Sequence, residues 1–182
     1  GGKTLALGAQ MRNTGRLYAF DISEKRLAKL KPRMARSGLS NVHPVVIAHE
    51  NDAKVKRLAG KADRVLVDAP CSGLGTLRRN PDVKWRQTPE GVGELNAKQT
   101  AILASAARLV KPGGRLVYAT CSLLQEENEA IVQQFLAAND AFTLAFDLRW
   151  RGKVPGAVGV RQQVAHSCAE ARHEARRPSE SR

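Results

Sequence analysis

The sequence predicts an α/β fold built on a mostly parallel sheet with helices on both faces. Four apolar runs have the length and composition of buried strands, at residues 17–21, 42–48, 65–69 and 116–120. Helical or loop segments separate these runs, and such alternation is typical of parallel strands joined by crossovers. The last two runs also lead directly into a cysteine. Open parallel sheets bind ligands at the carboxyl ends of their strands, so this pattern favours a functional edge.

In the first third of the chain, capping residues mark the element boundaries. The first strand ends in Asp21, and Ser23 is a suitable N-cap for a helix that we expect to extend to Ser37. Gly38 is its expected stop, because glycine readily adopts the left-handed conformation that ends many helices. Pro32 is expected to kink or shorten this helix.

The segment between the two cysteine strands has the spacing of a crossover helix. Its apolar stripe consists of Leu95, Ile102, Leu103, Ala106, Leu109 and Val110. The Lys-Pro-Gly-Gly sequence at 111–114 is expected to end the helix. A further helix is expected from the Glu126 and Glu127 pair to about Ala138, with both acids in the first turn, where they complement the helix dipole. A short strand is expected at 142–146.

Length and composition predict one domain with a basic extension. The chain has 182 residues, of which 42% are hydrophobic, and this is enough for one domain with a core. We expect one folded domain over residues 1–146, incomplete at its N-terminus, followed by a basic, disordered tail over 147–182, where apolar periodicity is almost lost. The chain begins without methionine and is expected to be a fragment.

The charge balance favours a polyanionic partner. Thirty Lys and Arg face seventeen Asp and Glu, for a net charge of +13. The eight basic and four acidic residues from Asp147 onward account for only a small part of this surplus. Nucleic acid is the first candidate, through phosphate contacts and counterion release. The alternative is a solvated surface that only maintains solubility.

Three widely separated cysteines with no Cys-x-x-Cys pair argue against a disulfide scaffold or a zinc site. The four histidines have no metal-ligand spacing, so we expect no metal. We further expect a monomer in the cytoplasm with no membrane association, since no apolar run approaches the length of a membrane span and the N-terminus has no signal-peptide pattern.

Cys71 and Cys121 follow the two late strands in Pro-Cys-Ser and Thr-Cys-Ser settings. Carboxyl ends of parallel strands meet at one edge of a sheet, so the two thiols are expected to face each other. The alternative for either cysteine alone is a purely structural role as a small buried hydrophobic side chain, which is the usual role of a free cysteine. Two such settings together favour shared chemistry.

Several motifs, in the right order, resemble the RNA cytosine-5 methyltransferases of the RsmB/Sun type over roughly residues 1–138. They are Asp-Ala-Pro-Cys-Ser-Gly at 68–73, Arg-Arg-Asn-Pro-Asp-Val-Lys-Trp at 78–85, Tyr-Ala-Thr-Cys-Ser at 118–122 and Glu-Glu-Asn at 126–128. The resemblance implies a Rossmann-like class I methyltransferase fold that uses S-adenosylmethionine, with the first strand missing here. It also implies RNA as substrate, with ribosomal RNA favoured.

The resemblance assigns roles to the two thiols. In the family the Thr-Cys-Ser cysteine is the nucleophile that adds to carbon 6 of cytosine, and this cysteine corresponds to Cys121. The Pro-Cys-Ser cysteine of the family assists product release and corresponds to Cys71. DNA cytosine-5 methyltransferases use a Pro-Cys nucleophile, so chemistry alone leaves the reverse assignment open. Asp68 resembles the acid that hydrogen-bonds the flipped base. Its alternative is a strand-end acid capping a loop.

A second group of residues is expected to contact the cofactor. Asp21 fits the acid that binds ribose hydroxyls, although it could instead cap the next helix. Gly1, Gly2 and Lys3 resemble the back half of the family's glycine-rich cofactor loop.

The acid near the adenine should follow the 42–48 strand. Glu50, Asn51 and Asp52 compete for that role, and Asp52 is favoured. Asp68 is also counted among the expected cofactor contacts.

A basic loop follows the first cysteine turn and is expected to bind RNA. It contains Arg78, Arg79, Lys84 and Arg86, with Trp85 among them. Such residues hold phosphates around a flipped base. The alternative is that Trp85 packs in the core and the charges are simply solvated.

Two rival functions are considered beside methyl transfer. The first is a P-loop nucleotide hydrolase. Gly2-Lys3-Thr4 matches the end of a Walker A loop, and residues 65–68 match an apolar strand that ends in a magnesium-binding acid. It leaves both cysteine motifs unexplained. The second is a non-catalytic RNA-binding remnant, because the first strand is expected to be missing and residues 147–182 do not resemble the family's C-terminal strand pair.

Overall fold

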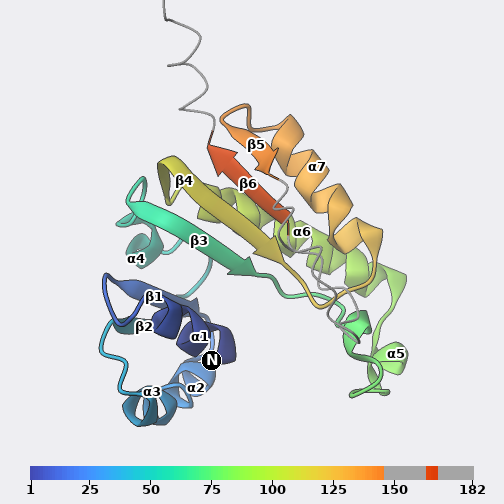
Figure 1. The fold of residues 1–182 in the computed structure, drawn as a ribbon. Coiled ribbons are helices and arrows are strands. Elements are labelled where there is room, and N and C mark those ends of the chain that lie inside the picture. The colour runs from blue at the N-terminus through green and yellow to red at the C-terminus, as the bar shows by residue number, and fades with distance from the viewer. Residues whose placement is uncertain (146–162, 168–182) are drawn as a thin grey trace, which may run out of the picture. The chain divides into compact units, whose positions relative to one another are not determined.

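A computed structural model describes residues 1–145 and 163–167 (Figure 1). The chain divides into two compact units, Gly1–Val55 and Lys56–Arg182, and each is described by itself. Each unit contains a parallel strand pair accompanied by helices, so the predicted α/β class is confirmed. The domain boundary expected after residue 146 stays a prediction.

The first unit is a parallel strand pair with short helices. Strands β1 and β2 pair from Leu17↔Val42 to Asp21↔Val46. Leu27, Leu30 and Val42 form its small buried core. Its elements are α1 (Gly2–Gln10), β1 (Leu17–Asp21), α2 (Glu24–Ala28), α3 (Lys31–Ser37), β2 (Val42–Val46) and, at the boundary of the unit, α4 (Ala53–Lys56).

The helix predicted from Ser23 to Ser37 is present as two pieces, α2 and α3. The Ser23 hydroxyl caps α2 by accepting the Arg26 N–H, and Gly38 ends α3 in the left-handed conformation with φ of 69°. Pro32 lies in the first turn of α3, where its missing N–H costs nothing. Pro32 was expected to kink or shorten one helix, and it instead follows a break between two helices.

The second unit contains a four-stranded sheet of order β3-β4-β6-β5. β3 and β4 are parallel, whereas β6 is antiparallel to both of its neighbours. Its elements are β3 (Ala62–Asp68), η1 (Leu74–Thr76), α5 (Val83–Arg86), α6 (Pro89–Ala107), β4 (Val110–Ala119), η2 (Gln125–Glu127), α7 (Glu129–Ala137), β5 (Phe142–Ala145) and β6 (Gln163–Ser167).

Several element boundaries differ from the prediction, and α7 begins at Glu129 and not at the Glu126 and Glu127 pair. The crossover helix ends at Ala107, and Val110, assigned to its apolar stripe, instead begins β4 opposite Ala62. Residues 111–114 then loop out of the ladder, which resumes at Arg64↔Arg115. In the first unit, β2 ends at Val46 because the Ala48 N–H is bound by the Asp52 carboxylate and leaves the ladder. Apolar spacing alone does not distinguish the last turn of a helix from the first residue of a strand.

The C-terminal part of the sheet was only partly predicted. The strand expected at 142–146 is β5, and Phe146 lies outside the described residues. β6 lies within the segment expected to be disordered, and it forms ladders with β4 and β5. Residues 147–162 and 168–182, the rest of that segment, lie outside the described residues.

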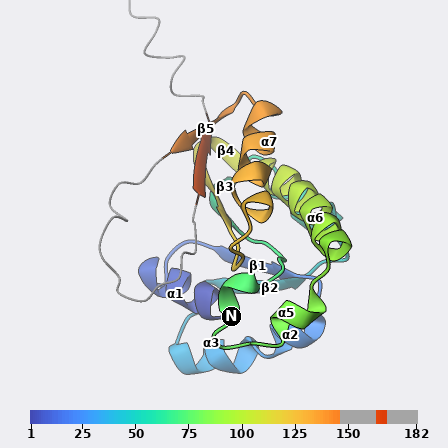
Figure 2. The same ribbon diagram turned by 90° about the vertical axis from the view of Figure 1, so that its right-hand side faces the viewer.

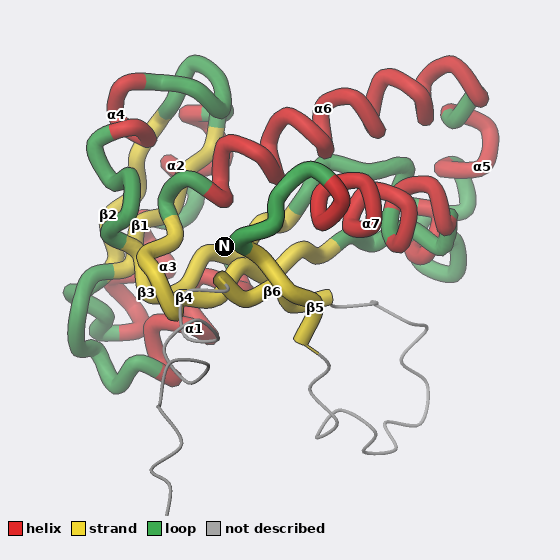
Figure 3. The backbone as a smooth tube through the Cα atoms, turned by 90° about the horizontal axis from the view of Figure 1, so that it is seen from above, coloured by secondary structure: helices red, strands yellow, loops and turns green. Residues whose placement is uncertain are grey.

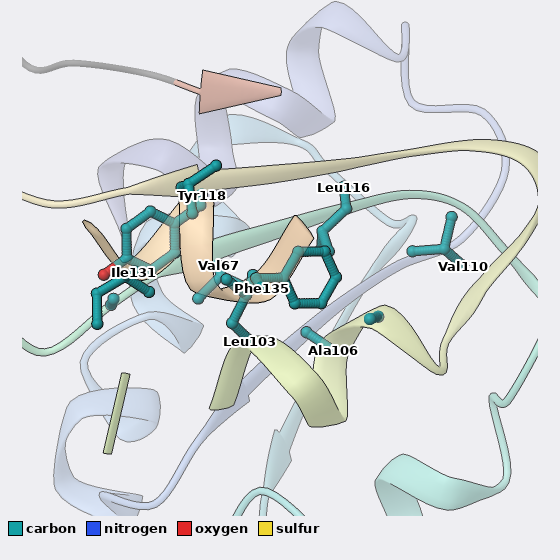
Figure 4. Packing of buried hydrophobic residues seen from close by; sticks show 11 residues of the cluster. Val67, Leu103, Ala106, Val110, Leu116, Tyr118, Ile131 and Phe135 are labelled. Carbon is teal, nitrogen blue, oxygen red and sulfur yellow. The ribbon is translucent and has the colours of Figure 1, made fainter. Parts of the chain in front are cut away.

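Helices α6 and α7 cover one face of this sheet and contact each other (Figures 2 and 3). Leu103 and Ala106 of α6 and Phe135 of α7 pack with Leu116 and Tyr118 of β4 in one buried cluster (Figure 4). Leu116 and Tyr118 are two residues apart, so both point to the helical face. This packing holds β3 and β4 in place, together with the turns that leave their carboxyl ends.

Candidate active site

The two cysteines predicted to face each other do so. β3 and β4 reach the same edge of the sheet in register, Asp68 opposite Ala119, and the Ala69 N–H donates to the Ala119 carbonyl at 2.9 Å. Beyond this last rung, the Cys71 and Cys121 Sγ atoms lie 3.2 Å apart. The Cys121 backbone N–H also donates to the Cys71 sulfur at 3.3 Å.

The two thiols have different surroundings. Cys121 is exposed, whereas Cys71 is partly buried behind it. Burial, followed by the hydrogen bond with Cys121, raises the pKa of Cys71 to about 11. Cys71 is therefore a neutral thiol near pH 7, while Cys121 is the sulfur accessible from solution.

A buried carboxylate lies behind the cysteine turns. Glu127 is fully buried, and its Oε1 accepts the Ser72 N–H at 2.8 Å and the Gln99 amide at 3.0 Å. Its Oε2 accepts the Ser72 hydroxyl in a short hydrogen bond. Gln99 also donates to the Pro70 carbonyl at 2.9 Å. Glu127 and Gln99 together thus hold the residues on either side of Cys71.

A chain of hydroxyl groups connects this carboxylate to the second cysteine turn. Ser72 and Ser122, the residues directly after the two cysteines, place their hydroxyl oxygens 3.0 Å apart. The only hydroxyl proton of Ser72 is donated to Glu127, so Ser122 must donate to Ser72. The Ser122 oxygen in turn accepts the Leu124 N–H at 3.0 Å. Both serines are buried, which fixes the two turns relative to each other.

Asn128 fixes the backbone of the second turn. Its amide nitrogen donates to the carbonyls of Ser122 and Leu124, at 3.2 and 2.7 Å, and its oxygen accepts the Thr120 hydroxyl at 2.6 Å. The Thr120 oxygen also accepts the Ser122 N–H at 3.1 Å. Cys121 therefore lies between two residues that Asn128 binds, Thr120 through its hydroxyl and Ser122 through its carbonyl.

Two of these positioning residues were missed or misassigned by sequence reasoning. Glu127 was expected to complement a helix dipole, but it lies in η2 before α7 and is used by the cysteine turns. Gln99 received no role, although it is a polar residue between Leu95 and Leu103 on the apolar stripe of α6, and it is fully buried. A polar residue in an apolar helical stripe is the available signal, because buried polar groups require partners.

Gly75 allows η1 to pack directly on the Cys121 backbone. Its N–H donates to the Cys121 carbonyl at 2.9 Å, and a Cβ at this position would lie 2.6 Å from the same oxygen. Gly75→Ala is therefore expected to lower the free energy of unfolding by about 1–3 kcal/mol, measured by urea titration. Gly93 in α6 is the matched control, since a Cβ there meets nothing within 4 Å and Gly93→Ala should stabilise the helix by about 0.5–1 kcal/mol. Changes of the same sign in both variants would contradict this packing argument.

The other predicted catalytic and RNA-binding residues lie in the same unit as the cysteines. Asp68 is exposed at the last position of β3. Trp85 is 79% exposed, which excludes the alternative that it packs in the core, and Lys84 lies over its ring at 4.5 Å. Arg78, Arg79 and Arg86 are also exposed, and Arg86 forms a surface ion pair with Asp82 at 3.7 Å.

The residues expected to contact the cofactor lie in the first unit. Gly2 and Lys3 belong to the first turn of α1 and not to a loop, because helix-forming residues follow them; only Gly1 precedes the helix. The Asp21 Oδ1 accepts the Ser23 N–H at 2.8 Å and is paired with Arg26 at 2.7 Å.

Asp52 has a structural role in its own loop. Its two oxygens accept the N–H groups of Ala48 and Lys54, and these bonds hold its pKa below the ordinary value. Of its two competitors, Asn51 donates to the Glu50 carboxylate at 2.9 Å. Which of the three approaches an adenine stays a prediction.

Within the part of the chain that the structure describes, no helix is long and apolar enough to span a membrane. No group of three or more His, Cys, Asp or Glu side chains among residues 1–145 and 163–167 is arranged to hold a metal ion.

Solved structures confirm the class I methyltransferase fold. The chain is 28% identical to NSun6 from Pyrococcus horikoshii, whose structure was determined with SFG, and superimposes with a TM-score of 0.72 over 92% of this chain and 44% of that one. A methyltransferase homologue from the same organism is also 28% identical, with a TM-score of 0.68 over 91% of this chain and 57% of the other.

Sequence relatives identify the family. The chain is 45% identical over 136 residues to the probable ribosomal RNA small subunit methyltransferase B of Synechocystis sp., covering 75% of this chain and 30% of the relative. It is 42% identical over 147 residues to the ribosomal RNA small subunit methyltransferase F of Aeromonas salmonicida, covering 79% of this chain and 30% of that relative. Residues 1–172 match the family described as 16S rRNA methyltransferase RsmB/F. The chain, which spans about 30% of the length of these curated relatives, belongs to the RsmB/F family of 16S rRNA methyltransferases.

Proposed function

We propose that this chain carries the chemistry for transfer of a methyl group from S-adenosylmethionine to carbon 5 of a cytosine in RNA, with small-subunit ribosomal RNA as the substrate class. The observation that carries the proposal is the pair of thiols 3.2 Å apart at the ends of two parallel strands. The names of the relatives support the choice of RNA. The P-loop alternative does not account for two adjacent thiols.

Cys121 is the proposed nucleophile. Carbon 5 of cytosine is too weakly nucleophilic to take a methyl group, but addition of a thiolate to carbon 6 converts the ring into an enamine that is reactive at carbon 5. The attacking sulfur must reach the face of the base, and Cys121 is the exposed member of the pair. Asp68, three residues before Cys71, is proposed to hold the polar edge of the base.

Cys71 is proposed to assist product release. The methylated ring must lose its carbon 5 proton, after which the ring double bond re-forms and the bond between carbon 6 and the Cys121 sulfur breaks. A base for a carbon-bound proton must be strong, and burial raises the pKa of Cys71 to about 11. Its thiolate is therefore scarce near neutral pH but strongly basic once formed.

The first unit offers a cofactor-binding edge of suitable chemistry. S-adenosylmethionine supplies an electrophilic sulfonium methyl group when bound. Asp21 ends β1 with a partly buried carboxylate suited to ribose hydroxyls, and the next residue, Ile22, is 65% exposed and can cover an apolar ring. Gly1, Gly2 and Lys3 at the start of α1 are proposed to approach the methionine part.

Calorimetric titration of the chain with S-adenosylhomocysteine, the unreactive product, tests the cofactor proposal. We expect saturable binding, and at least about tenfold weaker binding for Asp21→Asn, because the amide keeps the shape and the oxygen that accepts the Ser23 N–H but loses the charge. Asp63→Asn is the matched control, since Asp63 is an exposed acid in the second unit paired with Lys111.

Absence of binding at millimolar ligand would favour the RNA-binding remnant over the enzyme. Equal affinities for wild type and Asp21→Asn would remove Asp21 from the site while leaving the methyltransferase proposal in place. Binding of Mg-ATP in preference to S-adenosylhomocysteine would favour the P-loop alternative.

The basic loop is proposed to hold RNA phosphates, and this proposal gives a separate prediction. Arg78→Ala together with Arg79→Ala is expected to weaken RNA binding and to reduce the slope of log K against log salt by about 1.4, since each lost contact with a single strand contributes about 0.7. Fluorescence anisotropy at several salt concentrations measures both effects.

The matched control is the pair Lys56→Ala and Arg57→Ala, which removes the same charge. These two exposed residues precede β3, at the opposite end of the strand from Cys71. If both double variants lose affinity equally, binding depends on net charge alone and the basic loop has no special role.

A further inference from the structure

The thiol pair has a second chemical capacity besides methyl transfer. A disulfide joins sulfur atoms about 2.05 Å apart. The Cys71 and Cys121 sulfurs are already 3.2 Å apart as free thiols. A side-chain movement of about 1.2 Å therefore closes the gap.

The backbone around the pair is held from both sides. On the strand side, the Ala69 N–H donates to the Ala119 carbonyl. On the loop side, the Ser72 and Ser122 hydroxyls lie 3.0 Å apart, and Ser72 is bound to the buried Glu127. Neighbouring strands of a sheet lie about 4.8 Å apart, a spacing close to the Cα separations found across disulfides. The fold thus supplies the proximity that disulfide formation needs.

We propose that Cys71 and Cys121 form a modification site, at which a hydroperoxide converts the two thiols reversibly into a disulfide. Cys121 loses its proton, and its thiolate attacks one oxygen of hydrogen peroxide, so that a sulfur–oxygen bond forms and the oxygen–oxygen bond breaks. The hydroxide that leaves takes up a proton, which gives a sulfenic acid and water. Cys71 loses its proton and attacks the Cys121 sulfur, forming the disulfide and releasing a second water. The peroxide is reduced by two electrons, and the two thiols are oxidised by two.

The order of these steps follows from the different exposure of the thiols. Cys121 faces solvent and meets the peroxide first, whereas Cys71 is partly buried and already in contact with the Cys121 sulfur. Burial raises the pKa of Cys71, which keeps it protonated and protects it from direct oxidation. Exposed Cys121 is thereby diverted from irreversible over-oxidation to a disulfide that a dithiol can reduce.

The consequence for activity rests on the proposed function. A Cys121 sulfur bonded to Cys71 cannot add to carbon 6 of cytosine, so oxidation would stop methyl transfer, and reduction would restore it. The disulfide itself depends only on the geometry of the second unit and can be tested without cofactor or RNA.

The test uses the full chain carrying Cys168→Ser, which leaves Cys71 and Cys121 as its cysteines. After treatment with stoichiometric hydrogen peroxide and alkylation, we expect the protein to lose the mass of two hydrogens and to take up no alkyl groups. Trypsin should release residues 65–78 and 116–149 as one linked species that dithiothreitol separates. In urea the linked species should form at least about tenfold more slowly, because the held geometry is lost.

Two results would overturn the proposal. One is a gain of oxygen on separate peptides with no linked species, and the other is equal rates of linkage in the folded and urea-unfolded chains. If the disulfide forms but the reduced chain neither binds S-adenosylhomocysteine nor methylates RNA, the proposed function fails while the modification site stands. If the reduced chain is active and no disulfide forms, only the further inference fails.

Discussion

Cys121→Ala is expected to abolish both methyl transfer and covalent capture of RNA, with a loss of activity of at least about a thousandfold, because no other group in the proposed mechanism can add to carbon 6. The measurement pairs transfer of labelled methyl groups with denaturing electrophoresis of protein–RNA adducts. Cys121 is exposed, so its truncation removes little packing and the variant should keep the stability of the parent chain.

Cys71→Ala is the informative partner of this variant. If Cys71 assists release, its loss should slow breakdown of the adduct by about a hundredfold or more, so that a protein–RNA adduct accumulates in the presence of the cofactor. The double variant should form no adduct. An adduct that persists without Cys121 would reverse the roles and make Cys71 the nucleophile, as in the DNA enzymes.

Glu127→Ala is expected to be among the most destabilising single changes in the second unit. It leaves the Ser72 N–H and the Ser72 hydroxyl without their acceptor and removes one of the two acceptors of the Gln99 amide, at positions that are 3% exposed or less. Each buried group that loses its partner costs about 1–3 kcal/mol, so a total loss of about 3–5 kcal/mol is expected. Urea unfolding of the whole chain measures it.

Two further variants serve as controls for Glu127→Ala: one changes the neighbouring glutamate, and the other removes only the charge of Glu127. Glu126→Ala changes the exposed neighbour and should alter stability by no more than about 0.5 kcal/mol. Glu127→Gln keeps the volume and one acceptor oxygen, so it should fold with about half the loss and remain usable if Glu127→Ala does not fold. Because Glu127 holds the residues around Cys71, Glu127→Gln should also slow formation of the Cys71–Cys121 disulfide. Equal stability of Glu127→Ala and Glu126→Ala would show that the hydrogen-bonded carboxylate contributes nothing.

Local features of the fold could be predicted because they depend on residues near one another in the sequence. The Ser23 cap and the Gly38 stop were predicted, because a cap needs only a hydroxyl or a left-handed glycine at one position. The predicted end of α6 was wrong, because Val110 satisfies the apolar pattern of both a helix and a strand. The β6 strand was missed, and its ladder with β4 joins segments that are distant in sequence.

Some features of the candidate site could likewise be predicted from the sequence, and others depend on tertiary packing. Two strands that each run into a cysteine were enough to predict that Cys71 and Cys121 meet, because parallel neighbours end at one edge. The Asp52 carboxylate accepts backbone N–H groups of its own loop, and its contact with an adenine stays a prediction. Glu127 was expected to complement a helix dipole in the first turn of a helix, and only its burial shows its role.

The sequence by itself determined the α/β class, the family and the two thiols, because periodicity, turn chemistry and motif order are properties of the linear chain. The tertiary structure decided that the sulfurs lie 3.2 Å apart, that Glu127 and Gln99 hold the turns that carry them, and that Trp85 is exposed. The physical reason is that burial and hydrogen-bond partnership are set by packing between distant segments. A buried carboxylate and a solvated one have the same letter in the sequence and differ only in what surrounds them.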